Sequence, residues 1–177
     1  MTGARGVPPV TPPPDVRFVA DVMLGRLARW LRAFGYDTLY VRNAPDARLL
    51  GIALREGRRL LTRDTALARR AAASGFLIRS EDLDAQIGEV LAAFGLAARA
   101  PLSRCLECNG RLSASGPDEV RDRVPPYTYA THREFRVCAG CARVFWDGSH
   151  VQGIRERLGR HLGPVPPGAD GTAGAPP

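Results

Sequence analysis

The chain has 177 residues, of which 45% are hydrophobic, and a formal net charge of +7, which allows one ordinary packed domain with a small addition. No apolar run reaches the roughly 20 residues that a bilayer crossing needs, and the first residues lack a secretion signal, so we expect a cytoplasmic protein with no membrane partner. All 25 basic residues are arginines, whose guanidinium groups bind phosphate well. A GC-rich genome also enriches arginine, so the charge only weakly favours nucleic acid as the partner.

Proline is concentrated at the two ends of the chain. Ten of the 15 prolines lie within residues 1–15 and 163–177, which contain too few apolar side chains to compensate for the entropy lost on ordering. We therefore predict that both ends are disordered tails.

Residues 16–97 repeat one pattern: a short apolar run, a polar corner, an amphipathic stretch and a glycine. The runs are at 16–20, 36–41, 58–62 and 76–79. Runs of this length are typical of strands, and strands that alternate with helices form parallel sheets covered by helices on both faces. The pattern predicts an α/β fold, with a three-layer α/β/α arrangement around a parallel sheet.

An aspartate stands at each of three corners. Asp21 ends the first run, Asp46 opens the helix after the second, and Asp64 follows the third run in the sequence LTRD. The carboxyl ends of neighbouring parallel strands share one rim, which is where ligands bind. Each aspartate alone is most simply explained as a helix cap, but three carboxylates on one rim repel each other unless a cation lies among them. Oxygen ligands favour Mg²⁺ or Mn²⁺, which can activate water to cleave a phosphodiester bond.

The four cysteines form two close pairs, Cys105 with Cys108 and Cys138 with Cys141. Two such pairs supply four sulfur ligands for tetrahedral Zn²⁺, which makes a structural site because no position is left for water. The alternatives are a redox dithiol or an iron cluster, but a redox pair is expected to open a helix after a strand, and neither pair has that setting. We predict a zinc ribbon with a C-terminal helix over residues 98–162.

Arginines repeat every three residues along the first predicted helix, at Arg26, Arg29 and Arg32, and we expect this basic edge to be exposed to solvent. Arg26 and Arg63 lie nearest the predicted rim, so they are the candidates for binding a substrate phosphate. His150, in WDGSH, is a candidate substrate contact or an acid for the leaving oxygen, with plain solvent exposure as the alternative.

The order of the three aspartates, with LTRD at the third corner, resembles the PIN-type ribonuclease fold. The stretches FVADVMLGRLARWLRAFGYDTLYV, LLTRD, RCLECNG and CAGCARVFWDGSH together resemble the family named for the C-terminal RNase domain of the Mut-seven exonuclease, a PIN-like domain joined to a zinc ribbon. The resemblance covers about residues 17–158. It implies metal-dependent cleavage of RNA, with Asp21, Asp46 and Asp64 as catalytic residues that bind Mg²⁺ or Mn²⁺.

The sequence departs from the broader PIN pattern in two places. VML follows the first aspartate, where a small polar residue is usual, and the fourth acid of the pattern is either Asp82 or Asp84 in SEDLDAQ. We favour Asp82 because it lies nearer the predicted strand end. A first-turn acid behind a Ser80 cap explains Asp82 equally well.

Two other functions fit the same residues. In the first, the ribbon is a non-catalytic module that binds nucleic acid or a protein, and the acidic corners only cap helices. In the second, the rim hydrolyses a small phosphorylated metabolite. The sequence does not decide whether the substrate is RNA or DNA, or whether cleavage is endo- or exonucleolytic. It also does not decide whether a protein inhibitor or complex partner exists.

Overall fold

The computed structural model describes residues 15–96 and 101–163, with Ser149 and His150 described by their backbone alone. The two predicted tails therefore lie almost wholly outside the described residues, and so does the side chain of His150. None of the described helices is long and apolar enough to cross a bilayer.

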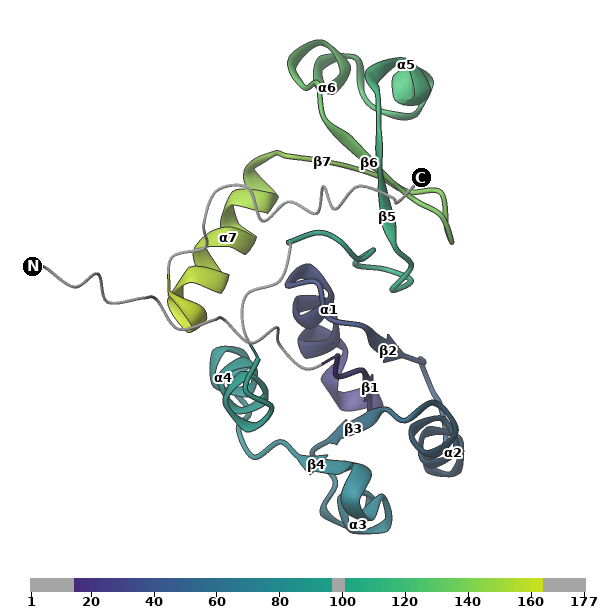
Figure 1. The fold of residues 1–177 in the computed structure, drawn as a ribbon, viewed down its shortest axis with the longest axis vertical. Coiled ribbons are helices and arrows are strands. Elements are labelled where there is room, and N and C mark those ends of the chain that lie inside the picture. The colour runs from purple at the N-terminus through teal and green to yellow at the C-terminus, as the bar shows by residue number, and fades with distance from the viewer. Residues whose placement is uncertain (1–14, 97–100, 164–177) are drawn as a thin grey trace, which may run out of the picture.

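A parallel sheet forms the centre of the first unit (Figure 1). Its strands are β1 (Phe18–Ala20), β2 (Thr38–Tyr40), β3 (Arg59–Thr62) and β4 (Gly75–Leu77), in the order β2-β1-β3-β4. The helices are α1 (Gly25–Ala33), α2 (Asp46–Glu56), α3 (Thr65–Arg70) and α4 (Leu83–Ala93), with short 3-10 turns η1 (Val22–Leu24) and η2 (Ala72–Ser74). All neighbouring strands pair in parallel, which confirms the predicted α/β fold.

Alternate residues of the two central strands face opposite sides of the sheet. In β1, Phe18 and Ala20 belong to the apolar core that includes α1 and α4, whereas Val19 belongs to the core formed with α2 and α3. In β3, Leu61 belongs to the core with α1 and α4, and Leu60 belongs to the core with α2 and α3. A strand that is buried on both faces needs apolar side chains at every position, which is why these strands read as continuous apolar runs.

The second unit is built on an antiparallel sheet. Its strands are β5 (Leu112–Ser115), β6 (Phe135–Cys138) and β7 (Val144–Trp146), in that order, and α5 (Pro117–Val120), η3 (Arg121–Arg123) and α6 (Pro126–Thr131) lie between β5 and β6 in the chain. Among the described residues, the core of this unit has three fully or nearly buried apolar side chains, Val120, Val124 and Phe135. A core of this size contributes little stability, and modules this small usually rely on a cross-link or on packing against a larger unit.

The last helix, α7 (Ser149–Leu162), leaves the second sheet and packs against the first unit (Figure 1). Ile154 and Leu158 are buried in the same core as α1 and α4. Arg157 donates two hydrogen bonds to Asp84 of α4, from Nε to Oδ1 at 2.6 Å and from Nη2 to Oδ2 at 2.8 Å. The helix that was predicted to end the ribbon therefore also ties the ribbon to the α/β unit.

Candidate active site and metal centre

Four aspartates follow the four parallel strands, and we call this set the acidic rim: Asp21, Asp46, Asp64 and Asp82. Asp21 comes directly after β1, and Asp64 comes two residues after the last residue of the neighbouring β3. Asp46 is the first residue of α2, and Asp82 is the N-cap of α4. Because the strands are parallel, the four corners lie at one edge of the sheet.

Asp21 is the buried member of the acidic rim, with only 6% of the residue exposed. Its Oδ1 accepts a hydrogen bond from the backbone N–H of Val22 at 2.6 Å, and its Oδ2 accepts one from the Thr62 hydroxyl at 2.7 Å. The same hydroxyl oxygen accepts a hydrogen bond from the backbone N–H of Asp64 at 3.0 Å. Thr62 thus links the two central acids, a role that sequence reasoning missed although LTRD contains it.

Asp64 and Asp82 each cap the helix that follows them. Oδ1 of Asp64 accepts from the N–H of Leu67, and Oδ1 of Asp82 accepts from the N–H of Ala85, both at 2.9 Å. Among the described residues, no protein donor is bonded to Oδ2 of either carboxylate. Both residues are exposed, so a cap and a ligand contact are compatible on the same side chain.

Asp46 is engaged differently, because its Oδ2 accepts a hydrogen bond from Nη1 of Arg70 at 2.8 Å. The two side chains are 47% and 52% exposed. An ion pair this exposed contributes about 0.2–1 kcal/mol, so it can exchange for another partner at small cost.

The acids of the rim do not form a tight ligand cluster. Within the described part of the chain, only the four cysteines form a group of three or more metal-ligating side chains whose ligand atoms all lie within 4.8 Å. The carboxylate oxygens are chemically suited to Mg²⁺ or Mn²⁺, but a shared ion requires the exposed acids to turn toward Asp21. The metal ligation that the sequence predicts for Asp21, Asp46 and Asp64 stays a prediction.

The candidate phosphate-binding arginines differ in their surroundings. Arg26 is exposed at the start of α1. Arg63 forms an ion pair with Glu81, in which the glutamate side chain is 84% exposed. Asp84, the alternative fourth acid, is held by Arg157 and by His161 of α7, whose Nε2 lies 3.2 Å from its Oδ1.

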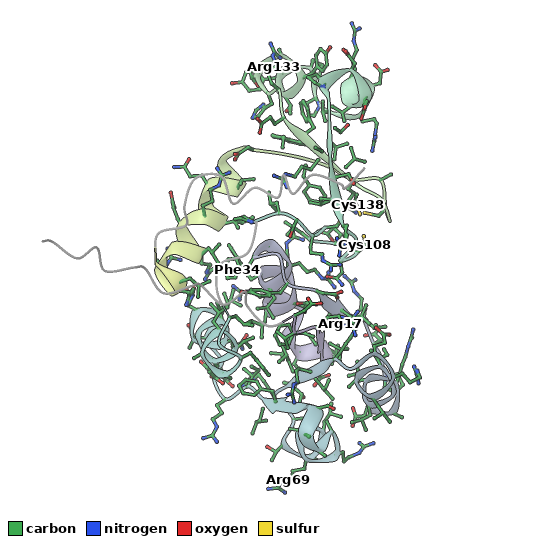
Figure 2. All side chains as sticks on the ribbon, viewed as in Figure 1. Arg17, Phe34, Arg69, Cys108, Arg133 and Cys138 are labelled. Carbon is green, nitrogen blue, oxygen red and sulfur yellow. The ribbon has the colours of Figure 1, made fainter. Side chains whose placement is uncertain are left out.

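The four cysteine sulfurs all lie within 4.8 Å of one another. They come from two turns, residues 105–108 (the first cysteine turn) and 138–141 (the second), and Figure 2 labels one cysteine of each, Cys108 and Cys138. Cys105 Sγ lies 3.6 Å from Cys141 Sγ, and Cys108 Sγ lies 3.3 Å from Cys138 Sγ. Tetrahedral zinc with Zn–S bonds of about 2.3 Å separates its sulfurs by about 3.8 Å, so the four side chains could hold a metal such as zinc.

The two turns that carry the cysteines share one backbone feature. The residue after the second cysteine of each pair has a left-handed conformation, with φ of 69° at Asn109 and 59° at Ala142. Gly110 follows the first turn, and a Cβ there would lie 3.0 Å from Cys138 Sγ and 3.3 Å from Cys108 Sγ, so a larger residue would require the sulfurs to shift. The chain is therefore shaped around the sulfur cluster.

The thiols are not equally acidic. Burial raises the pKa of the Cys105 thiol to about 12. Burial also acts to raise the pKa of Cys138, but hydrogen bonds from the backbone N–H of Cys141 and from Cys108 outweigh it and lower that pKa to about 7. A bound divalent cation would favour the thiolate form of all four residues.

Arg32 fastens the first cysteine turn to the α/β unit. It is only 4% exposed, so the predicted solvent exposure of the basic edge is wrong at this residue. Its Nε donates to the carbonyl of Thr38 at 2.8 Å, and its Nη1 donates to the carbonyls of Leu106 and Glu107 at 3.0 and 2.9 Å. Both acceptor carbonyls on the turn belong to the residues between Cys105 and Cys108, so one guanidinium group bonds the backbone that joins these two cysteines.

Asn109 adds a second attachment at the same place. Its Oδ1 accepts from the N–H of Thr38 at 3.0 Å, and its Nδ2 donates to Oδ1 of Asp37 at 2.8 Å. Asp37 also accepts from Arg58 Nη1 at 2.6 Å and lies 3.3 Å from Arg104 Nη2. Burial acts to raise the pKa of Asp37, but the hydrogen bonds from Arg58 and Asn109 outweigh it and hold that pKa below its ordinary value.

The chain matches a family model described as the Mut7-C RNAse domain over residues 16–158. The match begins before β1 and ends within α7, so it includes the acidic rim and all four cysteines. No curated protein matches the chain. A domain described as an RNAse indicates a nuclease role. The resemblance seen in the sequence is confirmed, and the chain belongs to the Mut7-C RNAse domain family.

Proposed function

We propose that the chain is a metal-dependent ribonuclease that hydrolyses RNA phosphodiester bonds at the acidic rim. The observation that carries this proposal is the Thr62 hydroxyl, which joins Asp21 and Asp64 at the ends of two neighbouring strands within a Mut7-C RNAse domain. A catalytic centre needs its ligands held in fixed positions, and a buried hydroxyl that bonds the carboxylate of Asp21 and the backbone N–H of Asp64 provides such a restraint.

In this proposal Asp21 and Asp64 are the principal ligands of Mg²⁺ or Mn²⁺. Asp82 would bind the ion through Oδ2, because its Oδ1 caps α4. Asp46 would bind it after the exposed ion pair with Arg70 has opened. When bound, the ion lowers the pKa of a water ligand and stabilises charge on the phosphate.

The arginines near the rim position the substrate. Arg26 is exposed and close to Asp21 in the chain, and Arg63 is held at the rim by an exposed partner, Glu81, which a phosphate can replace. We also propose that His150 contacts the RNA or protonates the leaving oxygen.

We further propose that the four cysteines bind one structural Zn²⁺, which is consistent with the reducing cytoplasm that the sequence predicts as the location. The three-residue core of the ribbon supports this proposal, because a metal can supply the stability that so small a core lacks.

The nuclease proposal is tested with labelled RNA in a Mn²⁺ titration that compares wild type with Asp21→Asn and Asp64→Asn. Asparagine caps a helix about as well as aspartate, so Asp64→Asn keeps α3 while it removes the charge. We expect either change to reduce cleavage at least a hundredfold. Asp118→Asn, which alters an exposed acid in α5 of the ribbon, is the matched control and should cleave like wild type.

One rival function also has an observation in its favour. Since Asp64 and Asp82 cap helices and Asp46 pairs with Arg70, the acids have structural roles that need no metal. The chain would then be a binding module for nucleic acid. RNA binding without metal-dependent cleavage in wild type would support that function and reject the nuclease, whereas hydrolysis of free nucleotides alone would indicate a metabolite hydrolase.

A further inference from the structure

A groove lies between α1, the first cysteine turn, β7 and α7. It has a volume of about 340 Å³, and its lining is mostly apolar, with the aromatic side chains of Trp30, Phe145 and Trp146. A second hollow of about 370 Å³ adjoins it, because Arg29, Val144 and Phe145 line both. An apolar hollow beside an open one with arginines is a suitable shape for an amphipathic ligand.

Phe145 is the aromatic residue common to both hollows. It is partly buried, yet among the described residues it belongs to none of the clusters in which apolar side chains pack together. Its neighbours on β7, Val144 and Trp146, do pack against the ribbon core. A partly buried aromatic side chain that lines two hollows can offer its ring to a ligand that enters them.

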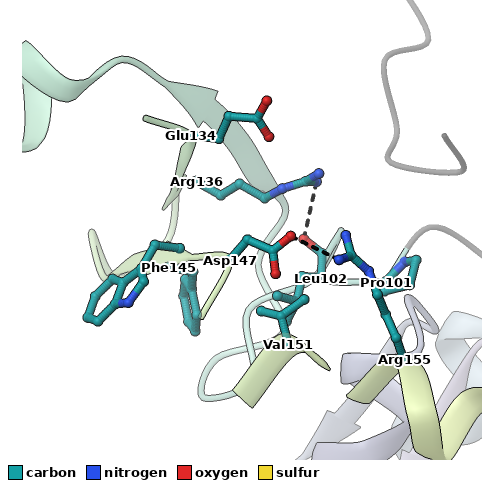
Figure 3. A pocket seen from close by; sticks show the side chains of 9 residues that line it. Pro101, Leu102, Glu134, Arg136, Phe145, Asp147, Val151 and Arg155 are labelled. Carbon is teal, nitrogen blue, oxygen red and sulfur yellow. Dashed lines mark hydrogen bonds and ion pairs between the residues drawn. The ribbon is translucent and has the colours of Figure 1, made fainter. Parts of the chain in front are cut away.

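A third cavity beside Phe145 is too small for such a ligand, with a volume of about 40 Å³ (Figure 3). Two contacts narrow it: Arg155 Nη1 lies 2.9 Å from Asp147 Oδ2, and Arg136 donates to the carbonyl of Leu102 at 3.5 Å. A ligand at Phe145 is therefore directed to the larger hollows.

Positive charge predominates in the second hollow. Arg29, Arg123 and Arg143 line it, with Glu107 as the acidic lining residue. Glu107 forms an ion pair with Arg29, so the other two arginines face the hollow without an acidic partner among its lining residues. The charge favours an anion.

We propose that this groove binds one unpaired nucleotide of an RNA strand, with the base on Phe145 in the apolar hollow and the phosphate at the arginines of the second. Aromatic faces and arginines together are the usual means of holding single-stranded nucleic acid. The inference rests on the proposed ribonuclease function and gives it a substrate subsite outside the acidic rim.

Helix α1 connects the groove with the acidic rim. It begins after η1, which follows Asp21, and its exposed Arg26 and Arg29 lie one turn apart, about 4.5 Å along the axis. Arg29 already lines both hollows. One RNA strand can therefore contact the rim and the groove along the same helix face.

The proposal is tested by fluorescence anisotropy with a short labelled single-stranded RNA and no added divalent metal, so that binding is measured independently of cleavage. Phe145→Ala should weaken binding about tenfold, and Phe145→Trp should bind nearly as wild type. Phe145→Leu keeps most of the apolar volume and serves if the alanine variant does not fold. Tyr127→Ala, which removes an aromatic side chain from a residue that is 78% exposed on α6, is the matched control.

The phosphate contact has a separate signature. Arg143→Ala should reduce the slope of log affinity against log salt by about 0.7, the value for one phosphate contact on a single strand. Arg69→Ala, on α3 at the far end of the molecule from the ribbon (Figure 2), should leave the slope unchanged.

Binding that Phe145→Ala, Phe145→Leu and Arg143→Ala all leave unchanged would overturn the proposal, even if the chain cleaves RNA. Equal binding of double-stranded RNA with the same loss in Phe145→Ala would also overturn it, because a paired base cannot enter the groove. If the Phe145 and Arg143 variants weaken RNA binding but wild type shows no metal-dependent cleavage, the groove proposal would stand and the ribonuclease proposal would be rejected.

Discussion

The hydroxyl of Thr62 donates a hydrogen bond of 2.7 Å to Oδ2 of Asp21, between the ends of two neighbouring strands. Thr62 is completely buried, and Asp21 is 6% exposed. The hydroxyl oxygen also accepts from the N–H of Asp64. One small side chain thus satisfies a buried carboxylate and fixes the start of α3, so that the positions of two acids depend on it.

Thr62→Val should reduce both stability and cleavage. Valine has nearly the same shape but no hydroxyl, so a buried oxygen of Asp21 and the N–H of Asp64 lose their partner, at a cost of about 1–3 kcal/mol in the free energy of unfolding. We expect Mn²⁺-dependent cleavage to fall about tenfold or more at temperatures where the variant is folded. Urea denaturation and cleavage assays measure the two effects.

Thr62→Ser restores the hydroxyl and should recover most of the lost activity. Thr65→Val, at the exposed first position of α3, is the control for adding an apolar β-branched side chain. A Thr62→Val variant with wild-type cleavage would show that Asp21 does not need this restraint.

The corners of the sheet could be predicted because strands and helix caps have local signatures. The apolar runs predict Asp21 and Asp64 at strand ends, and these residues follow the last residues of β1 and β3 by one and two positions, whereas Asp82 lies five residues beyond β4 as the N-cap of α4. The direction of each side chain could not be predicted, since it depends on partners such as Thr62 and Arg70 from other elements. Whether the four acids share an ion depends on these directions.

Arg32→Ala should lower the free energy of unfolding by about 3 kcal/mol. The change removes a buried guanidinium and leaves the carbonyls of Thr38, Leu106 and Glu107 without this donor, and hydrogen bonds to charged groups contribute more than neutral ones. Arg29→Ala is the matched control, because this side chain is on the same helix one turn earlier and is 55% exposed. Equal losses in the two variants, measured by urea denaturation, would contradict the role of Arg32.

The basic edge of α1 illustrates what periodicity leaves undecided. Arg26, Arg29 and Arg32 have identical spacing in the sequence, and the first two are exposed as expected. Arg32 is buried because the first cysteine turn, more than 70 residues later, brings two carbonyls onto it. A contact between units so far apart in the chain leaves no local signal in the sequence.

If the four cysteines bind zinc as proposed, removal of that zinc should destabilise the α/β unit as well as the ribbon. Arg32 and Asn109 attach the first cysteine turn to the backbone of Thr38, so a turn that loosens without metal withdraws these partners. We expect about one zinc per chain in purified protein, and chelation should lower the thermal midpoint of the whole chain. The Cys108→Ser variant should behave like the chelated protein, and Ser113→Ala, at an exposed position of β5, like wild type.

Two results would count against this coupling. Less than half an equivalent of zinc after anaerobic purification would reject the zinc site. A ribbon that melts separately, while the α/β unit keeps its midpoint after chelation, would reject the link through Arg32 and Asn109.

The contact between α7 and α4 should make the free energy of unfolding depend on pH. Hydrogen bonds from Arg157, together with one from His161, hold the pKa of Asp84 well below the ordinary aspartate value of about 3.9. A carboxyl with a lowered pKa in the folded state stabilises that state above about pH 3.9, and this contribution is lost as the pH falls below that value. The Asp84 side chain is 43% exposed, so the contribution is about 1 kcal/mol.

Asp84→Asn should therefore be about 1 kcal/mol less stable than wild type at pH 7, and the two proteins should converge as the pH falls well below 3.9. Urea denaturation at a series of pH values measures the difference directly. Asp118→Asn, an exposed acid in α5, should run parallel to wild type throughout. If the gap between Asp84→Asn and wild type stayed constant with pH, the stabilisation would come from packing of Arg157 on Trp30, where its guanidinium carbon lies 4.4 Å from the ring centre, and not from the carboxylate.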